Sequence, residues 1–185
     1  MSTGLDRERA VRSVRRCERA AGALASARDP ESIQECWEEW AIAWRIAVDL
    51  LEGYGKRNKL IEEKLREISS KREASPDLAY VWAAGNAERH NPDGSTDRTN
   101  GHISINQARM DEPLIIDRLI IANGQIVDAR MRNASVEVSS GSVNFKDIPI
   151  RNGAVSAPAE ASPESLRKAG SSYIAELARM VMPRI

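Results

Sequence analysis

The sequence predicts an α+β protein in which an N-terminal four-helix bundle is followed by a small antiparallel β-sheet and a C-terminal helix. In the first ninety residues, apolar side chains recur every three or four positions, which is typical of amphipathic helices. Between about residues 102 and 150, short β-branched runs alternate with Gly and Asn turns, which is typical of antiparallel strands. Helical spacing returns after Ser162. We therefore expect two domains, a helical bundle over residues 1–91 and a sheet with its closing helix over residues 92–185.

The first predicted helix covers residues 5–27 and has one apolar and one basic face. Its apolar positions are Val11, Val14, Cys17, Ala21 and Leu24, and its basic positions are Arg7, Arg9, Arg12, Arg15, Arg16 and Arg19. A basic stripe can bind nucleic acid. However, the chain carries 27 Lys and Arg against 27 Asp and Glu, so it has no net charge that favours such a partner. We expect the basic face to be solvated or to pair with acidic residues of the next helix.

The second predicted helix starts at Asp29-Pro30, with Asp29 as N-cap and proline in the first position, and runs to about Glu52. Three of the four tryptophans lie on a seam of four- and three-residue steps, formed by Ile33, Trp37, Trp40, Trp44, Ala47 and Leu51. Such a stripe predicts a buried core rather than a cofactor site. The outer face is acidic, with Glu31, Glu35, Glu38 and Glu39, and Gly53-Tyr54-Gly55 is expected to end the helix.

Two further helices complete the predicted bundle. Residues 56–73 place Ile61, Leu65 and Ile68 inward, and Ser75-Pro76-Asp77 begins a fourth helix that reaches His90. In this fourth helix Leu78, Val81, Trp82 and Gly85 share one face, whereas Asn86 and His90 share another. Four helices with short connections predict an up-and-down arrangement.

The second half of the chain is rich in turns and strands. Residues 91–101 have loop composition, and Asn123-Gly124 between residues 113–121 and 125–131 is a strong hairpin signal. Other expected strands cover residues 102–105, 135–138, 142–145 and 148–150, which would form a sheet of four to six strands. Ser162-Pro163 then begins the last helix, with serine as N-cap.

Most catalytic and metal-binding patterns are missing from the sequence. It contains no Gly-rich phosphate loop, no nucleophile elbow and no zinc spacing of His and Cys. Asp93, Ser95 and Asp97 alternate as in a calcium loop, but Arg98 stands where that loop needs Gly and Ser104 where it needs Glu. We expect no cofactor and no metal.

The cellular setting is expected to be the cytoplasm. Cys17 and Cys36 are too few for a disulfide framework, which favours free thiols in a reducing compartment. No apolar run approaches the roughly 20 residues that span a bilayer, so we expect no membrane partner.

The segment from Leu78 to His90, LAYVWAAGNAERH, resembles the signature helix of HEPN-like helical domains. In that superfamily an Arg, followed by a polar residue such as Asn, precedes a His by four to six residues. Asn86 and His90 match this pattern, and Gly85 stands at the position of the Arg. The order of elements is also similar to that of uncharacterised bacterial proteins. The resemblance implies a helical domain that dimerises, and in active members a metal-independent ribonuclease whose Arg and His act on the scissile phosphate and the ribose 2′-hydroxyl.

Two functions follow from these residues and the resemblance. The first is a non-catalytic HEPN-like protein that self-associates through its helical half or binds a protein partner. The alternative is a ribonuclease with His90 as general acid–base, and RNA is a partner only in this case. Its candidate catalytic residues are Asn86, Arg89 and His90, although Arg89 points roughly 100° away from His90 on a helix. Equally, Asn86 and His90 could bond backbone groups at the helix end.

Overall fold

The computed structural model of the protein describes residues 3–57, 61–90, 94–122, 125–151 and 153–182. The chain divides into two compact units. Met1–Asp97 together with Val143–Ile185 form the first, which we call the helical unit. Arg98–Ser142 form the second, which we call the ribbon unit. The protein is α+β, as predicted, with four N-terminal helices, small antiparallel sheets and a C-terminal helix.

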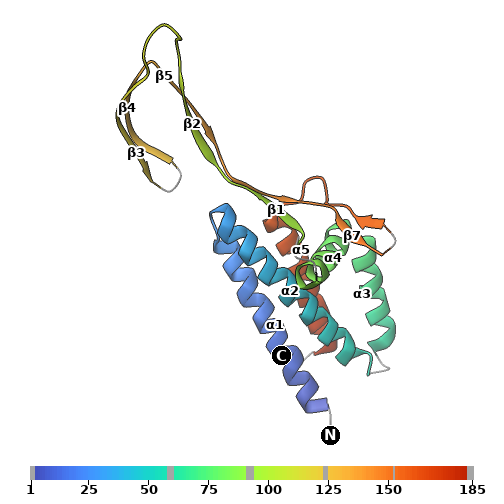
Figure 1. The fold of residues 1–185 in the computed structure, drawn as a ribbon. Helices are drawn as coiled ribbons and strands as arrows, with labels where there is room; N and C mark the ends of the chain where they lie inside the picture. The colour runs from blue at the N-terminus through green and yellow to red at the C-terminus, as the bar shows by residue number, and fades with distance from the viewer. Residues whose placement is uncertain (1–2, 58–60, 91–93, 123–124, 152, 183–185) are drawn as a thin grey trace. The chain divides into compact units, whose positions relative to one another are not determined.

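The described part of the helical unit is mostly helical (Figure 1), with five helices among the described residues. They are α1 (Thr3–Ser26), α2 (Pro30–Gly55), α3 (Glu62–Ala74), α4 (Pro76–His90) and α5 (Pro163–Val181). Three of the predicted helix starts are confirmed. α4 begins at Pro76, as expected from Ser75-Pro76-Asp77. The Asp29 side chain accepts the Ser32 backbone N–H at 2.9 Å, and Ser162 and Ser165 form a capping box at the start of α5.

The core of the helical unit is built around α2, which packs against α1, α4 and α5. Trp37, Trp40 and Trp44 are each 0% exposed, so the tryptophan seam is buried as predicted. Leu166 and Leu177 of α5 belong to the same core. The C-terminal helix is therefore a fifth member of the bundle. This grouping differs from the expected division between residues 91 and 92. Residues 91–162 separate α5 from α4 in sequence, although α5 packs against α2 and α4 in space.

Helix ends differ from the sequence prediction in two places. Gly53-Tyr54-Gly55 does not break α2, which continues through Gly55. Gly55 is buried, and a Cβ there would lie 3.2 Å from Val181 Cγ2, so this glycine serves close packing with α5 rather than a turn. The third helix starts at Glu62, six residues later than expected, and residues 58–60 lie outside the described residues.

The strands form pairs rather than the single sheet of four to six strands that we expected. The described strands are β1 (Thr96–Thr99) with β6 (Ser142–Phe145), β2 (His102–Gln107) with β5 (Ala134–Ser139), β3 (Ile115–Ala122) with β4 (Gln125–Arg132), and β7 (Ile148–Ile150) with β8 (Gly153–Val155). The pair β3–β4 lies between the strands of β2–β5 in sequence, and β2–β5 lies between those of β1–β6. Alternation within a segment predicts a strand, but it does not identify the strand's partner. The nested pairing into two-stranded sheets could therefore not be predicted from alternation.

Local details of the strand half are partly as expected. Ala122 pairs with Gln125, which agrees with the predicted hairpin, although Asn123 and Gly124 lie outside the described residues. The segment predicted as loop over residues 91–101 contains β1, and β8 was not predicted. A Cβ on Gly101 would lie 2.8 Å from the backbone of Ser139 and Gly141, so the two sides of the nested ribbon approach closely there. Among the described helices, none is long and apolar enough to cross a membrane.

Candidate functional site

The C-terminal part of α4 carries the residues on which the HEPN-like resemblance rests. Gly85 is buried against α2, and a Cβ built on it would lie 2.6 Å from the Ala41 carbonyl oxygen and 2.6 Å from Arg45 Cβ. Any side chain here requires α2 to move. The absence of a side chain at this position therefore allows contact between two helices of the same chain.

Asn86, the next residue, takes part in packing within the bundle. Its Oδ1 accepts a hydrogen bond from Arg45 Nε at 3.1 Å, and Arg45 also pairs with Asp49 one turn further along α2. The Arg45 guanidinium carbon lies 3.3 Å from the centroid of the Trp82 ring. Asn86 thus helps to orient a cation over an aromatic ring.

A second arginine lies on Trp82, at 3.7 Å from the ring centroid, and this is Arg72 of α3. Two guanidinium groups this close to one centroid would overlap on a single face, so Arg45 and Arg72 occupy opposite faces of the ring. Arg72 is only 8% exposed and donates to Glu52 Oε1 at 2.6 Å. This buried cluster joins α2, α3 and α4, and it compensates the charge of Arg72 by an ion pair and a ring contact.

Glu88 belongs to a second, separate network. Its Oε1 accepts from the Ser95 backbone N–H at 2.8 Å and from Ser95 Oγ at 2.5 Å. Trp37 Nε1 donates to Ser95 Oγ at 2.9 Å, and the Tyr80 hydroxyl lies within hydrogen-bond distance of the Ser95 and Lys146 carbonyl oxygens. Burial, and next the Glu88 charge, raise the pKa of Tyr80 above its ordinary value. These contacts attach the start of the strand half to α4.

Arg89 and His90 are exposed at the end of α4. Among the described residues, no hydrogen bond or ion pair joins Asn86, Arg89 and His90 to one another. Asn86 is held by Arg45 instead. Asn86 therefore takes part in packing within the bundle, whereas Arg89 and His90 are exposed to solvent. No described group of three or more His, Cys, Asp and Glu side chains is arranged to hold a metal ion.

The basic face of α1 is solvated, which was one of our two expectations. Arg9, Arg12, Arg15, Arg16 and Arg19 are all exposed. The other expectation, pairing with the acidic residues of α2, is not observed for these five arginines among the described ion pairs.

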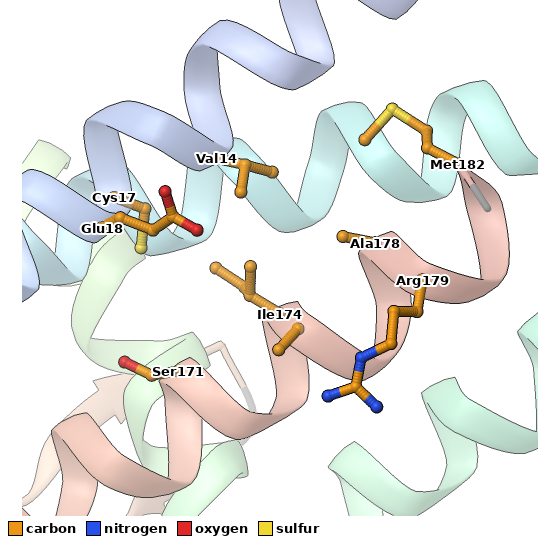
Figure 2. A pocket seen from close by; sticks show the side chains of 9 residues that line it. Val14, Cys17, Glu18, Ser171, Ile174, Ala178, Arg179 and Met182 are labelled. Carbon is orange, nitrogen blue, oxygen red and sulfur yellow. The ribbon is translucent and has the colours of Figure 1, made fainter. Parts of the chain in front are cut away.

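An apolar groove lies between α1 and α5 (Figure 2). Its volume is about 330 Å³, and Val14, Cys17, Ile174, Ala178 and Met182 form its apolar lining. Figure 2 shows Glu18 on the α1 side and the Arg179 guanidinium directed away from it on the α5 side. Burial raises the pKa of the Cys17 thiol to about 12, so Cys17 is a protonated packing residue at neutral pH and not a nucleophile.

Most of the exposed large hydrophobic residues lie in the ribbon unit. Among the described residues nine are exposed, and seven of them belong to this unit: Met110, Ile116, Ile120, Ile121, Val127, Val136 and Val138. Sequence reasoning missed this surface, because the strands were expected to join in one sheet of four to six strands. The signal was present in the alternating Ile103, Ile105 and Val136, Val138 pairs.

Comparison with known proteins gave no match: no family model, no curated protein and no solved structure is similar to this chain.

Proposed function

We propose that this protein is a non-catalytic interaction protein, in which the helical unit is a scaffold and the ribbon unit provides the binding surface. The observation that supports this most strongly is the contrast between the units. Among the described residues, twenty-seven hydrophobic ones are buried in the helical unit, whereas none of residues 98–142 is buried. Large exposed apolar surfaces on folded proteins mark interaction sites.

The HEPN-like relationship remains part of this proposal and rests on the residue pattern of α4 alone. A HEPN-like helical domain without the Arg would fit a binding role, since the phosphate would lack a bidentate donor for its charge. Self-association through the helical half would use the groove between α1 and α5. The ribonuclease alternative has no observation of its own in its favour, because Asn86 is engaged by Arg45 and His90 is solvated.

A cleavage assay on single-stranded RNA without metal tests the non-catalytic part of the proposal. Wild type and His90→Ala should both leave the RNA intact. A general acid–base typically raises a reaction rate about 10²–10⁴-fold, whereas the loss of one preorganised hydrogen-bond donor lowers it about 10²–10³-fold. His90 without the Arg should therefore accelerate RNA cleavage little. Cleavage by the wild type that disappears in His90→Ala would refute the proposal. His90 is exposed, so its replacement should leave the fold intact and make the comparison clean.

A further inference from the structure

The basic face of α1 forms a continuous row of positive charge on the outer side of this helix. Five exposed arginines, each within three residues of the next, make up this row, which we call the arginine stripe: Arg9, Arg12, Arg15, Arg16 and Arg19. At about 100° and 1.5 Å per residue, they fall within an arc of about 120° and extend over about 15 Å of the helix axis. Ala10, Cys17 and Ala21, which are buried in the core, lie on the opposite side of α1.

The charges of the arginine stripe are not compensated within the described part of the chain. No described ion pair or hydrogen bond involves any of the five side chains. Between residues 8 and 19, α1 carries these five Arg against Glu8 and Glu18, which leaves a local excess of positive charge. Exposed charges further than about 10 Å away are largely screened at 0.1 M salt, so this local excess decides which partner binds, although the whole chain is neutral.

The composition of the arc indicates what kind of anionic partner fits. Between residues 8 and 19 it contains only the arginine stripe and Glu8, and no apolar side chain. A protein partner would require an apolar centre of the interface, and a membrane surface would require apolar side chains that enter it. Arginine, in contrast, bonds phosphate oxygens in a bidentate manner. The stripe therefore fits a partner that presents closely spaced phosphates.

The shape of the stripe favours a DNA duplex over other nucleic acids. Proteins that bind single strands stack the bases on aromatic side chains, and α1 contains no aromatic residue. The major groove of B-form DNA is about 12 Å wide and admits a helix, whereas the major groove of an RNA duplex is deep and narrow. Arg9 and Arg15 lie at the two edges of the arc, so in this groove they would reach the phosphates of opposite strands. About 15 Å of duplex carries roughly nine phosphates, enough for all five arginines.

We propose that the arginine stripe of α1 binds the phosphates of B-form DNA along the major groove, without reading the base sequence. The stripe supplies charge to both rims of the groove, and the opposite side of α1 stays packed in the bundle. This surface belongs to the helical unit. It adds to the surface proposed for the ribbon unit and does not depend on it.

Fluorescence anisotropy with the full-length chain and a labelled DNA duplex of about 20 base pairs tests this proposal. Five phosphate contacts predict that the logarithm of the binding constant falls with the logarithm of the salt concentration with a slope of about −4.5. The double variant Arg12→Gln/Arg16→Gln should reduce this slope to about −2.7 and weaken binding about 60-fold at 0.1 M salt. Glutamine keeps the helix propensity, so α1 should stay folded.

Two further variants provide the controls. Arg66→Gln/Arg118→Gln removes the same charge from exposed arginines on α3 and β3, which pair with Glu62 and Asp128, and should leave the slope unchanged. Glu8→Gln removes the only acid of the arc and should strengthen binding about 3-fold, since it removes a negative charge near the phosphates. An increase in affinity cannot result from unfolding, so this variant separates a binding role of the stripe from a structural one.

Several outcomes would overturn the proposal. One is the absence of binding at 0.05 M salt, and another is an equal loss in the stripe variant and in the control of α3 and β3. Equal affinity for single-stranded DNA or for an RNA duplex would contradict docking in the major groove. Equal binding to vesicles of anionic lipid would show that the stripe attaches to any negative surface. Each of these results leaves the proposed function of the ribbon unit untouched, because none of them concerns that unit.

Discussion

The packing of Gly85 against α2 leads to a quantitative prediction about α4. Replacing Gly85 with Ala places a Cβ 2.6 Å from the Ala41 carbonyl oxygen and from Arg45 Cβ, and neither can move without α2. Inserting one methyl into a tightly packed contact costs about 1–3 kcal/mol. The helix itself gains about 0.5–1 kcal/mol from Gly→Ala. Because both contacts are at 2.6 Å and neither is the end of a flexible side chain, the cost should be in the upper part of that range, about 2–3 kcal/mol. The net expectation is a loss of about 1–2.5 kcal/mol in the free energy of unfolding.

Urea unfolding followed by tryptophan fluorescence measures this loss, since all four tryptophans lie in the helical unit. Gly22→Ala is the matched control. Gly22 lies within α1 with no heavy atom within 4 Å of a Cβ, so this change should stabilise the protein by about 0.5–1 kcal/mol. If Gly85→Ala is as stable as the wild type, the α2–α4 contact is not as close as described. The reading of Gly85 as a packing residue, rather than a lost arginine, would then fail.

Two other predictions concern the core. Trp44→Ala should cost roughly 3–5 kcal/mol, because it removes a fully buried ring and its 2.7 Å hydrogen bond to the Gly170 carbonyl oxygen; a loss below about 1 kcal/mol in urea unfolding would contradict the buried seam. Cys17 should destabilise the fold at alkaline pH. Its folded-state pKa is raised to about 12 from an ordinary 9.0, so the unfolded thiol ionises first and stability falls as pH rises above about 9, by up to roughly 1.4 kcal/mol per pH unit. Cys17→Ala should lack this part of the pH dependence, and an unchanged dependence would refute the assignment.

Much of the helical unit could be predicted from sequence because its signals are local. The tryptophan spacing predicts the buried face of α2, and the caps at Asp29 and Ser162 predict two helix starts. Gly55 shows where local reasoning fails. A glycine in a helical pattern can indicate either a turn or a close contact between elements. For Gly55 it is a close contact, because a Cβ built on it would lie 3.2 Å from Val181 Cγ2, and this neighbour is far away in the sequence.

The strand half and the candidate site depend on partners that spacing alone does not identify. Alternation in residues 102–105 and 135–138 predicts two strands with apolar faces, but not that they pair only with each other. Likewise, Asn86 and His90 share a helix face in the sequence. In the structure, however, Asn86 accepts a hydrogen bond from Arg45, which lies 41 residues away in the sequence, and this contact could not be predicted from spacing. The catalytic role of Asn86, Arg89 and His90 stays a prediction.

Hydrogen exchange of the full-length protein tests most directly that the ribbon unit is an exposed binding surface and not a second core. Amides of α2 and α4 should be strongly protected, since their protection comes from the core of the helical unit. Amides of β2–β5 and β3–β4 should exchange much faster, because no described residue of 98–142 is buried. Protection of these strands as strong as that of α2 and α4 would contradict the account.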